Sequence, residues 1–68
     1  MDPNANVAER THICLRIAEG NEQPGDTARL HELEFAYREW VTAGGFRAKP
    51  ALIAGLVRAD KRMRERTA

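Results

Sequence analysis

A histidine, a cysteine and an arginine alternate near the start of the chain, as His12, Cys14 and Arg16. Imidazole and thiol groups can bind a metal, and a thiol beside an imidazole can act as a nucleophile. The only other histidine is His31, so the fourth ligand of a structural zinc site is lacking. A catalytic Cys14–His pair would also need an enclosed pocket and an oxyanion hole, which nothing in this sequence supplies. We therefore expect no metal, no cofactor and no enzymatic activity.

The charged side chains divide the chain into an acidic and a basic part. Residues 1–45 carry four arginines against eight acids, whereas residues 46–68 carry seven lysines or arginines against two acids. The acids Glu32, Glu34 and Glu39 have the spacing of solvated helix charges rather than of an acid–base pair. The basic third could serve phosphates or could be an ordinary solvated helix face, and charge patterning alone leaves both open.

The length of the chain limits which elements can position these residues. Sixty-eight residues make one small domain, and a domain of this size buries only about 60% of its unfolded surface. A single cysteine excludes an intrachain disulfide, so oligomerisation is the remaining way to enlarge the core. The composition, 43% hydrophobic and 31% charged, is that of a globular protein. We therefore predict a single domain over residues 1–68 that forms a homodimer.

The sequence also predicts where in the cell the protein is found. No apolar run approaches the roughly 18 residues that span a membrane. The first residues lack the basic segment and apolar stretch of a signal peptide. A lone thiol is typical of a reducing compartment. We expect a cytoplasmic protein with no membrane partner.

A helix is predicted over residues 26–43. Asp26 suits its N-cap, and Gly44 with Gly45 suits its C-terminal end, because glycine readily adopts the left-handed backbone of a helix C-cap. Apolar residues recur at helical spacing between these ends. They are Leu30, Leu33, Tyr37, Trp40 and Val41.

Another helix is predicted over residues 50–66. Pro50 suits the first helical position and disfavours helical backbone at Lys49. The apolar face of this helix consists of Leu52, Ile53, Leu56 and Val57. Because a short linker joins the two helices, we expect them to form a helical hairpin.

The first part of the chain allows two interpretations. Residues 1–5 resemble a tail. Asn6 and Glu9 resemble a capping box and Gly20 suits a C-cap, which indicates a helix. Strict alternation over residues 11–17 is instead typical of a half-buried strand. The apolar side of that strand would consist of Ile13, Leu15 and Ile17. Both interpretations remain open.

The order of a short alternating segment, a helix, a glycine turn and a second helix resembles the ribbon-helix-helix family of small dimeric DNA-binding repressors. The segment HICLRI is similar to the family's ribbon. The stretch GGFRAKPALIAGLV is similar to its turn and second helix, with Gly45, Leu52 and Leu56 at matching positions. The resemblance covers residues 11–60. It implies a mainly α fold in which an N-terminal strand precedes the helical hairpin and two chains intertwine; the alternative is an all-α three-helix dimer.

The resemblance also implies how DNA would be bound. Two paired ribbons fit the major groove. Their outward side chains would be His12, Cys14 and Arg16, of which Arg16 can pair with guanine through two hydrogen bonds. Arg47 and Lys49 flank the start of the second helix, where two cations and free N–H groups would anchor a phosphate. The alternative for all five residues is a solvated polar face without a ligand.

Dimerisation and partner binding involve the apolar and aromatic residues. The predicted dimer interface comprises Ile13, Leu15, Ile17, Leu33, Tyr37, Trp40, Leu52 and Leu56. Phe35 lies off the apolar stripe, and beside Tyr37 it would offer an aromatic surface to a protein partner.

Two functions follow. The first is a small homodimeric DNA-binding transcriptional regulator of phage, plasmid or bacterial type, and we place it first. The second is a small protein-binding inhibitor that blocks a host regulatory protein without binding DNA. The second is favoured by the acidic first 45 residues and by a net charge of only +1, because DNA affinity comes mainly from cations that meet phosphates.

Overall fold

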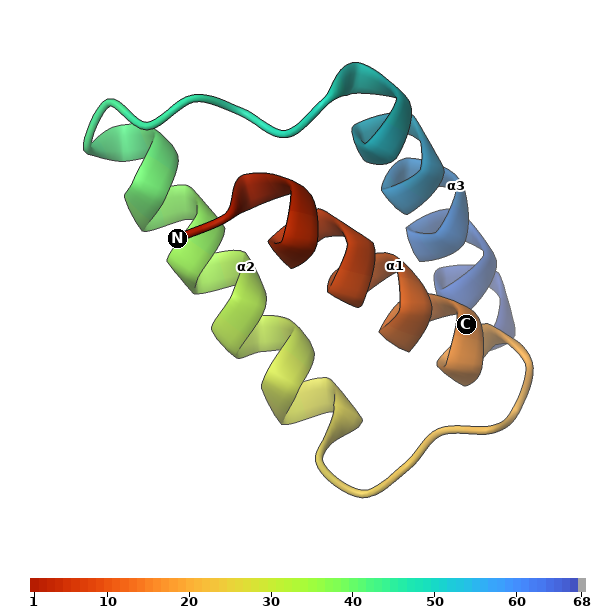
Figure 1. Ribbon diagram of the computed structural model, residues 1–68. Coiled ribbons are helices and arrows are strands. Elements are labelled where there is room, and N and C mark those ends of the chain that lie inside the picture. Colours follow the sequence, from red (N-terminus) through yellow and green to blue (C-terminus); the bar gives the residue numbers. More distant parts are fainter. Residues whose placement is uncertain (68) are drawn as a thin grey trace.

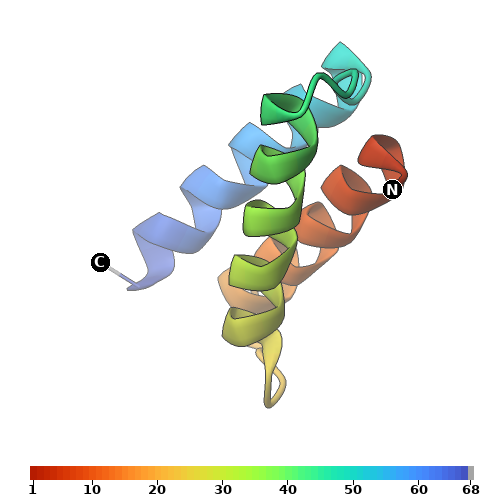
Figure 2. The same ribbon diagram turned by 90° about the vertical axis from the view of Figure 1, so that its left-hand side faces the viewer.

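The computed structural model describes residues 1–67, which form three helices and no strand. The helices are α1 (Pro3–Ala18), α2 (Asp26–Thr42) and α3 (Pro50–Thr67). Helices α1 and α3 lie side by side and run in the same direction, whereas α2 runs in the opposite direction (Figure 1). In Figure 2 α2 passes in front of the other two helices. The fold is therefore mainly α.

Helix α1 begins earlier than the sequence indicated. The Asp2 carboxylate accepts hydrogen bonds from the N–H groups of Asn4 (2.9 Å) and Ala5 (3.2 Å), and Pro3 occupies the first turn. An aspartate cap followed by proline is a strong start signal. Most of the predicted tail, residues 1–5, is thus helix, and Asn6 is a buried residue inside the helix rather than its cap.

The segment 11–17 is helical, so the strand interpretation is wrong and its alternative holds for these residues. The buried residues of α1 follow the helical period of three to four residues, except that one turn is passed at the partly buried Arg10. They are Pro3, Asn6, Val7, Ile13, Cys14 and Ile17. Residues 11–17 alternate like a strand because so short a segment does not reveal the helical period of the whole element. The C-terminal end is equally well defined, because Gly20 has φ +80° and the Asn21 N–H donates to the Arg16 carbonyl at 2.8 Å.

Helices α2 and α3 differ by one residue each from the predicted ranges 26–43 and 50–66. Gly44 (φ +97°) closes α2, and the Gly45 N–H donates to the Trp40 carbonyl at 2.8 Å, as in a Schellman motif. Asp26 is not the N-cap, since Gly25 holds that position. The Asp26 carboxylate accepts instead from the Gln23 N–H at 3.0 Å.

The core forms around α1 rather than between α2 and α3. Helix α1 packs closely against both other helices, whereas no Cα atom of α2 lies within 8 Å of one of α3 over residues 1–67, so these two helices do not form the expected closely packed hairpin. Buried residues from all three helices make up this core: Ile13, Cys14, Ile17, Leu30, Leu33 and Ala59. The central position of α1 follows from its two buried faces.

The α2–α3 linker passes over the N-terminal end of α1 (Figure 1) and is fixed there by two hydrogen bonds. The Ala48 N–H donates to the Tyr37 hydroxyl at 3.0 Å, and the Lys49 N–H donates to Asn4 Oδ1 at 2.9 Å. Within the described residues, no helix is both long and apolar enough to cross a bilayer.

Candidate functional site

Three adjoining hollows run along the space between α2 and α3, with α1 as their floor. Their volumes are about 300, 260 and 220 Å³. Arg10 of α1 lines all three, and neighbouring hollows share further residues such as Tyr37 and Val57. The three hollows therefore form one continuous depression, which we call the α2–α3 groove. It exists because the backbones of both flanking helices approach α1 more closely than they approach each other.

Aliphatic side chains from all three helices line part of the groove. They are Val7, Val41, Ile53, Leu56 and Val57. Val57 is 62% exposed, which makes it one of the most exposed large hydrophobic residues of the chain. An aliphatic side chain left in water inside a depression marks a surface that another molecule can cover.

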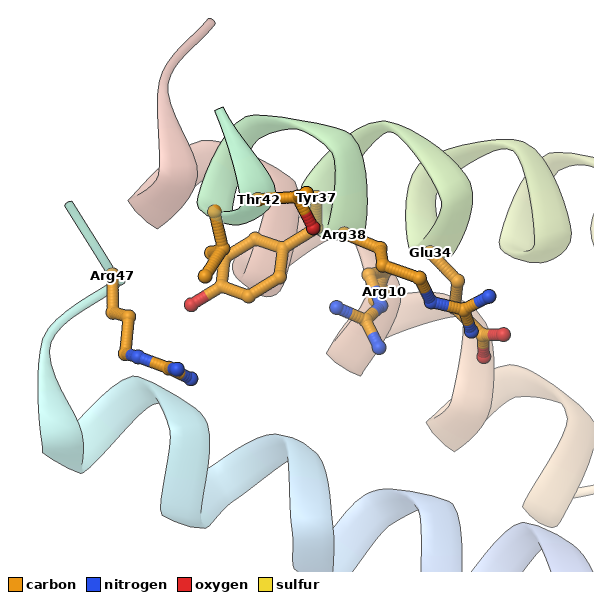
Figure 3. Close-up of a pocket in the computed structure, with 7 residues that line it drawn as sticks. Arg10, Glu34, Tyr37, Arg38, Thr42 and Arg47 are labelled. Carbon is orange, nitrogen blue, oxygen red and sulfur yellow. The ribbon is translucent and has the colours of Figure 1, made fainter. Parts of the chain in front are cut away.

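Arg10 occupies the centre of the groove. Its guanidinium lies 5.6 Å from the centre of the Tyr37 ring, a cation–π distance. Its Nε is buried and has no hydrogen-bond partner within the described residues. Arg47 reaches the same hollow from the linker and Arg38 reaches it from α2 (Figure 3). Three arginines, one each from α1, α2 and the linker, therefore line this hollow, with Arg10 between Arg47 and Arg38 in that view.

The groove contains fewer acids than arginines. Glu34 lies in the hollow with Arg10 and Arg38, and Asp60 lies in the hollow nearest the middle of α3. Asp60 is already paired, since Arg64 Nε donates to it at 2.7 Å. Among residues 1–67, Arg10, Arg38 and Arg47 form no ion pair. The groove therefore presents a net positive charge beside its aliphatic wall.

Cys14 also lines the groove floor, but it belongs to the core. Its side chain is 1% exposed, and burial raises the pKa of the thiol, with a further contribution from the nearby Asp60 carboxylate. A buried neutral thiol is a poor nucleophile. No cluster of three His, Cys, Asp or Glu side chains suited to a metal exists in the part of the chain that the structure describes.

The three residues predicted to face DNA from the ribbon do not share a surface. On a helix, residues 12, 14 and 16 point in different directions, because successive residues are about 100° apart. His12 is exposed, Cys14 is buried, and Arg16 is bound to Asp26. Arg16 Nε and Nη2 donate to the two Asp26 carboxylate oxygens at 3.1 and 2.7 Å. Arg16 therefore forms an ion pair that joins α1 to α2.

The Arg16 guanidinium and the Gln23 N–H together hold the pKa of the Asp26 carboxyl below its usual value. These two interactions favour the charged carboxylate, which joins the loop 19–25 to α1 through Arg16.

The two residues predicted to anchor a phosphate separate in space. Arg47 and Lys49 are both exposed just before α3. Arg47 lines the α2–α3 groove, whereas Lys49 does not line any of its hollows and is held by its backbone bond to Asn4.

Part of the predicted dimer interface is core of a single chain. Ile13, Ile17 and Leu33 are buried within the monomer. The others, Leu15, Tyr37, Trp40, Leu52 and Leu56, are only partly buried.

Trp40 contacts its own linker. The Trp40 and Phe46 rings pack edge to face with their centroids 5.9 Å apart. The Trp40 Nε1–H also donates to the Phe46 carbonyl at 2.8 Å.

The predicted aromatic partner surface does not form as one patch. Phe35 is 61% exposed on α2, whereas Tyr37 faces the groove. Sequence reasoning missed Arg10 and Arg38 as site residues, and it placed Val41 with Tyr37 only as part of an apolar helix stripe. No signal in the sequence unites Arg10 with Tyr37, because they meet only once α1 packs against α2. No protein-family model, curated protein or solved structure matches this chain.

Proposed function

We propose that this protein is a non-enzymatic binding module that holds a segment of a regulatory partner protein in the α2–α3 groove and thereby blocks that partner. The observation that carries the proposal is the groove itself, a depression with exposed Val57 and three arginines without ion pairs in the described chain. Concave surfaces that combine an apolar wall with a few convergent polar groups are where ligands bind.

The shape of the groove favours a polypeptide over a small molecule. Each hollow has a volume of about 300 Å³ or less, at or below the lower end of small-molecule pockets, which is about 300 Å³. Joined end to end, such hollows suit an elongated ligand that contacts several of them. Arg16 is paired with Asp26 and Cys14 is buried, so neither side chain is available for the DNA contact that the sequence indicated.

The experiment that tests this function selects peptides and then maps them. Random helical peptides are selected on the immobilised full chain, and the best binder is titrated into ¹⁵N-labelled protein. We expect amide shifts around Tyr37, Val41 and Val57. Val57→Asn should abolish binding, whereas Ala51→Asn, an exposed position of α3 that does not line the groove, should not. Shifts that map elsewhere, or binding that survives Val57→Asn, would contradict the proposal.

The proposal includes a homodimer of all-α chains in the cytoplasm. The partly exposed Leu15 and Leu52 and the exposed Phe46 offer apolar area for self-association. The single free thiol suits a reducing compartment. Sedimentation velocity over a range of concentrations tests the dimer, and a single species of monomer mass at every concentration would contradict it.

DNA-binding transcriptional regulation, implied by the resemblance to the ribbon-helix-helix family, is the second candidate. Because residues 11–17 are helical, DNA would have to be contacted elsewhere. The outer face of α3 favours this candidate, since Arg58, Lys61 and Arg62 are exposed there at helical spacing. Binding of mixed-sequence duplex DNA at low salt, lost in a triple glutamine variant of these residues, would support it. Absence of binding at low salt would rule it out.

A further inference from the structure

We infer that the segment held in the α2–α3 groove is an acidic amphipathic helix, whose carboxylates pair with Arg10, Arg38 and Arg47 while its apolar side covers Val57. This inference rests on the proposed function and names the chemistry of the partner.

The dimensions of the groove suit a helix. Its α3 wall runs from Ile53 to Arg64, which at 1.5 Å per residue is about 16 Å, or three helical turns. The flanking helices both pack on α1, and no Cα atom of one lies within 8 Å of a Cα atom of the other over residues 1–67. A helix laid between them would complete a four-helix arrangement and bury apolar anchors at every third or fourth residue.

The charges of the groove call for an acidic ligand. The three arginines at one end have no ion pair among residues 1–67, and of the two acids in the groove Asp60 is held by Arg64. Arginine and carboxylate form short, paired hydrogen bonds that are stronger than neutral ones. A basic or neutral helix would leave these guanidinium groups without partners as it removed them from water, which is costly.

Among the three arginines, Arg10 has the surroundings that most favour binding of a ligand carboxylate. Its Nε is already buried without an acceptor, which is unfavourable until one arrives. The Tyr37 ring restricts its guanidinium from one side. The ring is fixed in turn, because the Tyr37 hydroxyl accepts the Ala48 N–H at 3.0 Å. The same bond positions the linker that carries Arg47, so the receptor for the carboxylate is largely built before the ligand binds.

The chain itself offers one acidic helix face, the outer side of α2, where the exposed Phe35 lies between Glu32 and Glu39. Arg29 Nη1 donates to the Glu32 carboxylate at 2.6 Å, so this face carries less negative charge than its glutamates alone would give. We therefore assign the groove to a partner protein, and the second copy is an outcome that the experiment detects.

The experiment uses three matched amphipathic peptides, identical except that the residues flanking the leucine stripe are all glutamate, all glutamine or all lysine. Each is titrated into the full chain by calorimetry and by NMR. The glutamate peptide should bind with shifts at Val41 and Val57 and should weaken as salt is raised. The glutamine peptide should bind at least about tenfold more weakly, as expected when charge-assisted hydrogen bonds are lost. The lysine peptide should not bind.

Protein variants locate the carboxylate. Arg10→Gln should weaken the glutamate peptide by about tenfold and leave the glutamine peptide nearly unchanged. Because Arg10 is partly buried, Arg47→Gln on the exposed linker serves as a second variant and should act in the same direction. Arg62→Gln removes the same charge from the outer face of α3 and should have no effect on either peptide.

The outcomes separate this inference from the proposed function. Equal groove binding by the glutamate and glutamine peptides overturns the carboxylate inference and leaves the groove as a protein-binding site. No groove shifts with any peptide overturns both. Groove shifts that change with protein concentration alone show that a second copy occupies the groove. Groove shifts with duplex DNA of similar strength assign the arginines to phosphate. Either of the last two results also overturns the inference.

Discussion

At the scale of single residues, several charged and polar side chains join α1 to α2. Arg16 grips Asp26 between α1 and α2, and Arg29 Nε donates to Glu9 at 2.7 Å across the same two helices. Asn6 Nδ2 donates to the Leu33 carbonyl at 2.9 Å. Arg16 attracted attention in the sequence as a DNA-reading residue. Its partner ten positions away could not be identified before the loop 19–25 was known to fold back.

Asp26→Asn should flatten the acid side of the stability profile. The pKa of Asp26 is lower in the folded chain than in the unfolded chain. Its stabilising contribution is therefore complete above the unfolded value of about 3.9 and is lost as pH falls through the lower folded value. Thermal unfolding followed by circular dichroism should show the variant less stable than the natural chain at neutral pH, with the difference closing in strong acid. Parallel curves down to the lowest pH would contradict this assignment.

Gly45→Ala and Gly44→Ala should both destabilise the fold, but for different physical reasons. A Cβ on Gly45 would overlap the Trp40 indole, so the ring must move, and such overpacking costs about 1–3 kcal/mol. A Cβ on Gly44 meets nothing within 4 Å, but φ is +97°, so the cost is about 1 kcal/mol of backbone strain. Urea unfolding should show both losses. Only Gly45→Ala should shift the tryptophan emission, and an equal shift in both variants would refute the contact.

At the scale of elements, the helices were predictable where their ends carry local signals. Gly44 and Pro50 mark ends that the structure keeps, because a left-handed glycine and an N-terminal proline act within one turn. Helix α1 was ambiguous because alternating apolar residues also fit a strand. Its decisive cap, Asp2 with Pro3, lay in what resembled a tail. The groove was not predictable at all, because Arg10 and Arg47 are brought together only by the order in which the helices pack.

Ala59→Leu should separate α3 from α1. Ala59 is 2% exposed and is the one residue of α3, within the described range, that is fully buried. Its small side chain lets the two helices approach, and added methylenes in a packed contact cost about 1–3 kcal/mol. Ala54→Leu, at an exposed position of the same helix, is the control and should change stability little. Guanidinium unfolding of both variants measures the difference, and equal midpoints would show that this contact does not hold α3.

At the scale of the whole molecule, the accessible surface is slightly larger than the size of the chain predicts. Its accessible area is 4662 Å², against about 4300 Å² expected from the size scaling of folded monomers at this mass. The exposed side chains of Val57, Phe46 and Phe35 contribute apolar area to this surface. A bound helix or a second chain would reduce it, and either would raise the stability of so small a domain.

Cys14 reports on the opening of the whole molecule. The thiol is buried at the junction of the helices, and burial raises its pKa, so both access and thiolate formation oppose reaction in the folded chain. Modification by a thiol reagent should be slow at neutral pH and should speed up in parallel with global unfolding as urea is added. Rapid native-state labelling, at the rate measured for the fully unfolded chain, would show that Cys14 is not enclosed.

The packing of α1 on α3 also sets when the chain can fold during synthesis. The first helix lies mostly against the last one, and Lys49 closes onto Asn4, forty-five residues earlier. A nascent chain that has released only α1 and α2 from the ribosome has no α3 to cover the α3-facing side of α1. The core can therefore close only after α3 has left the ribosome. Until then the growing polypeptide exposes that apolar helix face to chaperones, to proteases or to an early-binding partner.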